Sequence, residues 1–212
     1  MRIVSLNVSL PRPALYRDRF FDTGIFKTPV QGRLAVRGDN LEGDGQADLS
    51  VHGGPDKAVY AYPSEHYAYW REILGLDLEW GGFGENLTTE GLDEASVRIG
   101  DRYRIGTALF KVTQPRLPCF KLAMKLGRDD IVDLFRASGR SGFYVAVVEE
   151  GGLGPGDAIE LVEPGAGAVT VAEVNRLERE SGDSDLLERV LSAPDLSASR
   201  REHFEKRRRG GS

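Results

Sequence analysis

The chain has 212 residues, a single cysteine and a net charge of −5 at neutral pH. Its length allows one sizeable hydrophobic core with a small appendage, and the lone cysteine excludes an internal disulfide. Secreted scaffolds held together by disulfides and enzymes that use an intramolecular dithiol couple are therefore excluded.

The charge is unevenly distributed along the chain. Residues 200–209 hold six Lys or Arg and two Glu, which leaves −9 on the rest of the protein. This acidic body argues against binding to nucleic acids. The basic run Lys206–Arg209 is interpreted as a helix end or a frayed tail, and contact with phosphate or an acidic partner is the less favoured alternative.

Neither a membrane span nor a secretion signal is predicted. No segment approaches the roughly 18 apolar residues that a spanning helix requires. The stretch Arg2–Leu10 alternates apolar and polar residues in the manner of a strand, unlike the continuous apolar stretch of a signal peptide. We therefore expect a cytoplasmic protein without a membrane partner.

Strand signals dominate up to residue 162. Runs rich in β-branched and aromatic residues are separated by Gly, Pro and Asp, and the 26 glycines suit many tight turns. The expected strands are Ile3–Val8, Arg33–Val36, Val59–Tyr62, Val97–Ile105, Ala108–Thr113, Phe143–Val148 and Ala158–Val162.

Two helices are expected between these strands. The first covers Ser64–Leu74, with Ser64 as its N-cap. The second runs roughly from Cys119 to Phe135 and is broken near Gly127.

Helical periodicity replaces the strand pattern after a linker at Glu163–Gly167. Thr170 and Glu173 have the spacing of a capping box, and an apolar stripe follows them. Asp185–Leu191 and Ser199–Arg207 add two further short helices. We therefore predict a β-rich domain at residues 1–164 and a helical extension at residues 165–212.

The cysteine closes the run Gln-Pro-Arg-Leu-Pro-Cys at residues 114–119. Two prolines stiffen this backbone, and the charge of Arg116 favours a thiolate at Cys119. Such a sulfur can bind a soft metal or carry sulfur. The alternative is a buried cysteine that acts as a small apolar side chain.

Four other segments precede this run in a fixed order. They read His-Gly-Gly at 52–54, Lys-Ala-Val-Tyr at 57–60, Gly-Phe-Gly-Glu-Asn-Leu at 82–87 and Ile-Gly-Asp at 99–101. Together the five segments resemble the MOSC domain family, named for the carboxy-terminal domain of molybdenum cofactor sulfurases, and most closely its stand-alone bacterial YiiM-like branch. The resemblance covers essentially the whole chain.

The resemblance implies both a fold and an activity. The fold would be mainly β within the α+β class: a MOSC-type closed β-barrel with a few helices, followed by a three-helix extension. The activity would be that of a molybdenum-cofactor (molybdopterin) oxidoreductase, which reduces N-hydroxylated compounds of the hydroxylaminopurine type to amines. Cys119 would be the molybdenum ligand, because a thiolate is a soft donor.

Cofactor binding would also need groups that recognise the pterin and its phosphate. Arg116 is the best candidate because its planar fork can bond two oxygens, and Lys57 adds a point charge. A surface salt bridge is the alternative for Arg116. Asn86 and Thr88 can bond a pterin edge, although an Asn after a flexible turn commonly bonds the backbone instead.

Two further residues are candidates for acid–base chemistry. Glu85 can donate a proton if burial raises its pKa. His52 precedes two glycines, where the backbone can approach a ligand, so it either bonds the pterin or moves a proton; the equal alternative is that it locks a turn. His66 lies on the first predicted helix with Tyr67 and Trp70, a spacing typical of a packed face, and is left out of the site.

The chain has no dinucleotide fingerprint and no cysteine set for an iron–sulfur cluster, so electrons must come from a separate reductase or a thiol donor. Two other functions stay open. One is a sulfur carrier or cofactor-handling protein that holds a persulfide on Cys119. The other is a ligand-binding barrel whose cysteine is inert.

Overall fold

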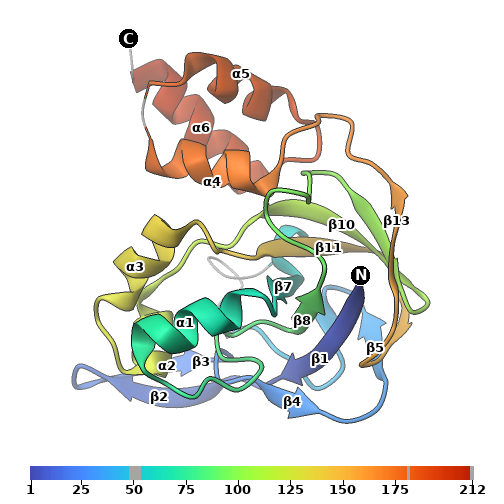
Figure 1. Cartoon of the computed structure of the whole chain (residues 1–212), viewed down its shortest axis with the longest axis vertical. Coiled ribbons are helices and arrows are strands. Elements are labelled where there is room, and N and C mark those ends of the chain that lie inside the picture. The colour runs from blue at the N-terminus through green and yellow to red at the C-terminus, as the bar shows by residue number, and fades with distance from the viewer. Residues whose placement is uncertain (48–53, 181, 211–212) are drawn as a thin grey trace.

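The protein is built around one eight-stranded sheet, with helices beside and above it in Figure 1. The computed structural model describes residues 1–47, 54–180 and 182–210. The strand order is β13-β9-β10-β11-β7-β8-β1-β4, and every neighbouring pair is antiparallel except β7 and β8. The strands are β1 (Arg2–Val8), β4 (Thr28–Val30), β7 (Val59–Pro63), β8 (Leu87–Glu90), β9 (Arg102–Ile105), β10 (Ala108–Pro115), β11 (Phe143–Glu149) and β13 (Ile159–Glu163).

The predicted α+β class is confirmed by this large sheet and six helices in the described residues. In the described residues the strand order places β13 and β4 at the two ends of the sheet. Backbone hydrogen bonds nevertheless link the start of β1 to the approach of β13. Ile3 N donates to Asp157 O at 3.0 Å, and Ile159 N donates to Met1 O at 3.0 Å.

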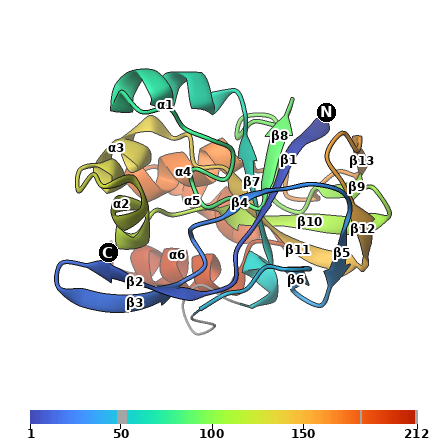
Figure 2. The same cartoon turned by 90° about the horizontal axis from the view of Figure 1, so that it is seen from below.

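Two smaller sheets were only partly expected from the sequence. One contains β12 (Gly151–Leu153), β5 (Leu34–Arg37) and β6 (Asn40–Leu41). The other is the hairpin of β2 (Arg12–Tyr16) and β3 (Arg19–Thr23), which extends away from the main sheet on the side of α2 (Figure 2). The sequence predicts the region of β5 but not the hairpin.

The single strand expected over Val97–Ile105 is wrong in its first half. Gly100 has φ 90° and turns the chain, and Asp101 Oδ2 accepts a hydrogen bond from Arg98 N at 2.8 Å. Strand β9 therefore begins only at Arg102. The apolar alternation of this segment reflects burial of Val97 and Ile99 beside a turn.

Three helices pack around an aromatic core at one side of the sheet. They are α1 (His66–Leu74), α2 (Phe120–Leu126) and α3 (Ile131–Ser138), so the predicted break at Gly127 is confirmed. The predicted N-cap at Ser64 is wrong, because Glu65 occupies that position and no side chain caps the helix. Trp70 stacks on Phe135 with ring centroids 5.6 Å apart, which holds α1 against α3.

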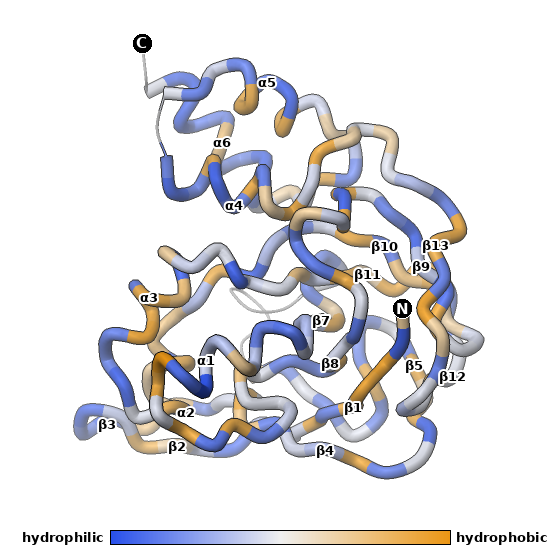
Figure 3. Tube along the Cα trace, in the orientation of Figure 1, coloured by the Kyte–Doolittle hydropathy of each residue, from blue (hydrophilic) through white to orange (hydrophobic). Residues whose placement is uncertain are grey.

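The carboxy-terminal segment forms α4 (Val171–Arg179), α5 (Ser184–Ser192) and α6 (Ala198–Gly210). The predicted capping box of Thr170 and Glu173 is confirmed. Figure 3 shows apolar and polar segments alternating along α4 and α5, as expected when one face is buried. The apolar residues of these helices join the hydrophobic core of the sheet as one continuous cluster. The domain division at residue 164 stays a prediction.

The basic run at the end of α6 contacts neighbouring helices. Arg207 donates hydrogen bonds to the carbonyl oxygens of Leu177 and Glu180 at the end of α4, and Arg208 pairs with Glu188 at 3.4 Å. These contacts favour the helix-end interpretation, because cations stabilise the carboxyl ends of helices.

The turn of the β2–β3 hairpin offers a stability test. Arg17 and Asp18 have φ 48° and 61°, in the left-handed region that most residues disfavour. We expect Asp18→Gly to raise the free energy of unfolding by about 0.5 kcal/mol, because the relief of strain exceeds the added chain entropy. Denaturant titration measures the change, and Arg19→Gly, within β3, should lower stability. A less stable Asp18→Gly protein would contradict the strain.

Candidate functional site

A cavity opens between the β10–α2 connection, the loop before β8 and the segment after β3. The empty space between its walls, including solvent at the mouth, is about 680 Å³. Four of the predicted site residues line it, namely Cys119, Arg116, Lys57 and Asn86. They are separated by up to 62 positions in the sequence, so the fold rather than the local chain brings them together.

Cys119 and Arg116 reach the cavity from the connection that follows β10. Cys119 is the N-cap residue of α2 with an extended backbone, φ −134°, and its side chain is partly exposed. Arg116 is 5% exposed and comes directly after the last residue of β10. The two groups therefore share one short, proline-stiffened segment.

The guanidinium of Arg116 lies between two aromatic rings. Its Cζ is 5.5 Å from the centroid of Tyr60 and 5.1 Å from that of Phe135, a cation–π arrangement. Burial lowers the pKa of Arg116, but nearby tyrosines, led by Tyr60, raise the pKa more, so the group stays charged. Its Nη1 is buried and has no hydrogen-bond partner among the described residues.

Positive charge dominates the cavity although the whole protein is acidic. Among the described residues, its lining includes, besides Arg116, the cations Lys57, Lys121 and Lys27 and one carboxylate, Asp44. Burial, followed by the charge of Arg200, lowers the pKa of Lys57. The excess of cations fits an anionic ligand.

Asn86 uses most of its hydrogen-bonding capacity within the protein. Its Oδ1 accepts from Tyr60 N at 3.1 Å, and its Nδ2 donates to Asn7 O at 3.3 Å and to Asp44 Oδ2 at 2.8 Å. Asp44 in turn pairs with Lys27, and both side chains are largely buried. Asn86 therefore forms part of the rigid cavity wall and retains only one acceptor position for a ligand.

Glu85 and Thr88 lie behind this wall rather than in the lining. Glu85 is fully buried and accepts hydrogen bonds from Tyr67 Oη, Gly81 N, Phe83 N and Thr88 Oγ1. The carboxylate thereby ties the loop before β8 to α1. This arrangement gives Glu85 a positioning role for Phe83, which lines the cavity.

Gly84 allows this loop to approach the opposite wall closely. It has φ 82°, and a Cβ atom there would meet Ile25 Cγ1 at 2.7 Å. Both residues line the cavity. The Gly-Phe-Gly pattern therefore shapes the cavity through close backbone packing.

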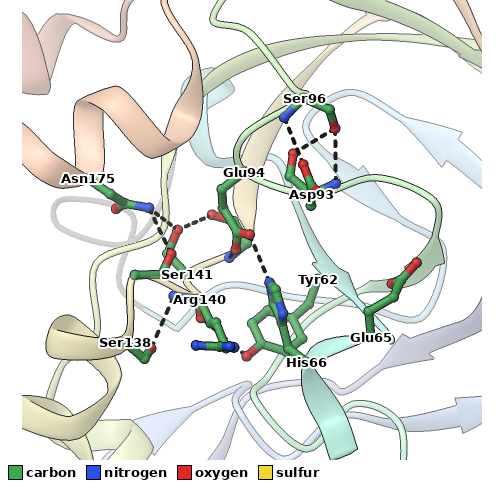
Figure 4. A network of polar contacts seen from close by, with 12 residues as sticks. Tyr62, Glu65, His66, Asp93, Glu94, Ser96, Ser138, Arg140, Ser141 and Asn175 are labelled. Carbon is green, nitrogen blue, oxygen red and sulfur yellow. Dashed lines mark hydrogen bonds and ion pairs between the residues drawn. The ribbon is translucent and has the colours of Figure 1, made fainter. Parts of the chain in front are cut away.

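Of His52 and His66, the structure describes only His66. His52 lies outside the described residues, so its predicted role stays a prediction. His66 Nε2 lies 2.8 Å from Glu94 Oε2, within the polar network drawn in Figure 4. It does not line the main cavity.

Sequence reasoning missed several charged residues of the site. Lys27 and Asp44 lie in segments that carry only turn signals, although Asp44 stands between two glycines, a pattern typical of a tight turn at a site. Lys121 also lines the cavity, and its position two residues after Cys119 was a signal from which the sequence could have identified it. Lys125, on α2, donates to Ile25 O at 2.8 Å and to Gly81 O at 2.5 Å, behind the cavity.

Comparison with known proteins identifies the family of this chain. The family model of the MOSC domain matches residues 48–160. The chain belongs to the MOSC domain family. The protein YflK of Bacillus subtilis is 43% identical over 97% of this chain and 94% of its own length. A crystal structure of YiiM from Geobacillus stearothermophilus shares 42% identity and a TM-score of 0.81, covering 97% of this chain and 98% of that one.

A more distant relative carries a functional word in its name. It is a protein of Gibberella moniliformis named Reductase, 32% identical over 74% of this chain but only 28% of its own length.

In the described part of the chain, no helix has the length and apolar character needed to cross a bilayer.

The buried Lys125 makes stability depend on pH. Burial lowers the pKa of Lys125 to about 8, against 10.5 for an ordinary lysine. Between these values the unfolded chain binds the proton more tightly, so the free energy of unfolding should rise with pH, by up to about 3 kcal/mol from this group. We expect Lys125→Met to show a shallower rise from pH 8 to 10.5 in denaturant titrations.

Lys206→Met, at an exposed position on α6, is the control and should keep the wild-type slope. The slope, not the absolute stability, is the result that matters, because Met also leaves two carbonyl groups without a donor. Equal slopes in wild type and Lys125→Met would contradict the buried charge.

Proposed function

We propose that the cavity binds a molybdenum–pterin cofactor and that the protein is an oxidoreductase. One observation above all supports the fit between the residues present and this cofactor. Arg116, whose buried Nη1 has no hydrogen-bond partner among the described residues, lines the same cavity as Cys119, the only thiol of the chain. A phosphate-bearing group with a soft metal needs both kinds of partner.

The proposal assigns roles to charged residues of the lining, to Cys119 and to two residues behind the wall. Arg116 bonds the phosphate or pterin oxygens with its planar fork, and Lys57 and Lys121 add point charges. The thiolate of Cys119 is the protein ligand to the metal. Glu85 and Thr88 act from behind the wall by holding Phe83 and the loop before β8 in place. Closure of the sheet into a barrel, through the hydrogen bonds between β1 and the approach of β13, would complete the wall.

The proposed reaction is the reduction of N-hydroxylated compounds, such as hydroxylaminopurine-type bases, to amines. It consumes two electrons and two protons and releases water. When bound, the cofactor supplies the two-electron chemistry that cleaves the N–O bond. The name of the fungal relative supports a reductase. A separate cytoplasmic reductase or thiol donor would deliver the electrons.

A sulfur-carrier function is the second candidate, because the thiol of Cys119 is partly exposed in the cavity. In that case Cys119 would hold a persulfide. The mass of the intact protein distinguishes the two functions, since a persulfide adds one sulfur atom.

Cys119→Ser tests the ligand role directly. We expect the substitution to abolish reduction of a hydroxylaminopurine substrate and to leave the melting temperature unchanged, because a hydroxyl of similar volume is a poor soft-metal ligand. Turnover with an added electron-donor system and thermal melting are measured on the same preparations. Full activity in Cys119→Ser would overturn the assignment.

Arg116→Lys tests the recognition of the phosphate. We expect less molybdenum and pterin per protein, because Lys keeps the charge but loses the two-pronged geometry. Lys57→Ala should weaken cofactor binding roughly tenfold to a hundredfold by removing one charge-assisted bond. Added salt should not deepen the loss in Arg116→Lys, because that side chain is buried.

The matched control is Arg128→Lys, at an exposed arginine paired with Asp130 at 2.7 Å. It should retain wild-type molybdenum and pterin after identical purification. Unchanged occupancy in both Arg116→Lys and Lys57→Ala would remove these residues from the cofactor site.

A further inference from the structure

A second cavity lies on the other side of the segment that carries Arg116. It is a cleft between α3 and α4 with about 610 Å³ of empty space up to its mouth. Arg116 and Leu117 line both this cleft and the proposed cofactor cavity, so the two spaces adjoin across these residues. The helical extension contributes one wall through α4.

The cleft carries an excess of positive charge. Three arginines line it, Arg116, Arg136 and Arg179, together with one carboxylate, Glu178. The carboxylate is already engaged outside the cleft lining, because Arg200 Nη1 lies 2.9 Å and His203 Nε2 lies 3.5 Å from its oxygens. No other carboxylate among the described lining residues balances the charge of the three arginines.

The donors of these arginines are largely unused. Arg136 and Arg179 form neither a side-chain hydrogen bond nor an ion pair with any residue that the structure describes. Arg116 adds a buried Nη1 without a partner in the described residues. By contrast Arg176, one turn earlier on α4, pairs with Asp183 at 3.0 Å. Arg179, on the cleft side of α4, is exposed and keeps its donors for solvent or a ligand.

The floor of the cleft is rigid. Asn175 Nδ2 on α4 donates to Ser141 Oγ at 2.7 Å, and Gly142 N donates to Glu94 Oε1 at 2.6 Å. Figure 4 shows this network joining α4 to the segment after α3. Gly139 lacks a side chain where a Cβ would meet Arg179 Nη1 at 2.6 Å, so the guanidinium lies directly on the backbone at the end of α3.

We propose that the cleft between α3 and α4 is a second binding site, for an oxyanion such as phosphate or carboxylate, held by Arg179, Arg136 and Arg116. Planar guanidinium groups match two oxygens of such an anion, and a buried unsatisfied donor gains most from one. The anion is either a free ion or the acidic group of a larger small molecule. In both cases Arg116 links its occupancy to the neighbouring cavity.

Calorimetric titration of the full chain with inorganic phosphate tests the site without any dependence on molybdenum. We expect saturable binding of one phosphate per chain at the cleft, weakened roughly tenfold to a hundredfold in Arg179→Ala and also in Arg136→Gln. Arg176→Ala is the matched control on the same helix and should bind as the wild type does. Melting curves establish that each variant is folded.

Three results would overturn the proposal. The first is the absence of saturable phosphate binding in the wild type. The second is phosphate binding in both cleft variants that equals binding in the wild type. The third is binding that is lost in Lys57→Ala but retained in Arg179→Ala. The last would place the anion in the cofactor cavity. Titration with adenosine and adenosine monophosphate separates the sources of the anion. Tighter, Arg179-dependent binding of the monophosphate than of phosphate indicates a larger ligand, and equal affinity indicates the free ion.

Discussion

A buried guanidinium that pairs with no carboxylate of the described residues is the constraint around which the centre of this protein is arranged. Burial of an unpaired charge is costly, and Arg116 is 5% exposed. The faces of Tyr60 and Phe135 offset part of that cost. Those rings come from β7 and from α3, so the sheet and the aromatic core must both be in place before Arg116 can be buried.

The burial of Arg116 also explains which hydrogen bonds the surrounding polar groups form. Tyr60 Oη donates to Ser141 O at 2.7 Å, and Arg116 N donates to Gly142 O at 3.3 Å. The first contact fixes the segment after α3 against β7, and the second fixes it against the residue that follows β10. An anion is the partner that the remaining donor lacks, because no carboxylate of the described residues reaches Nη1. The cavities on either side of Arg116 are where such an anion can enter.

Motif residues were the predictable part of the candidate site. Cys119 and Arg116 lie on a stiff segment whose direction depends little on the rest of the fold, and both line the cavity. Glu85 could not be placed from the sequence, because its acceptors are taken by backbone N–H groups that only the folded loop brings near. Lys27 and Asp44 were missed because their pairing joins distant turn segments.

The elements of the fold also divide into those that the sequence predicts and those that it does not. The capping box of α4 and the break at Gly127 are local and were predicted, whereas the β2–β3 hairpin was not. Its turn uses Arg17 and Asp18 where Asn-Gly is the usual signal. A contact with Phe120 on α2, whose ring centroid lies 4.8 Å from that of Phe21, helps to hold the hairpin, and no local pattern reports such a contact.

The helical extension is more than an appendage to the sheet. Val171, Val174 and Leu177 belong to the same hydrophobic cluster as the strands, so the position of α4 is set by burial against the sheet. Asn175 and Arg179 lie on the same helix and are carried with it to the edge of the cleft. Loss of apolar packing beneath α4 would therefore widen the cleft beside Arg116 without altering any residue that lines it. The geometry on both sides of Arg116 thus depends on a core that the sheet and the extension share.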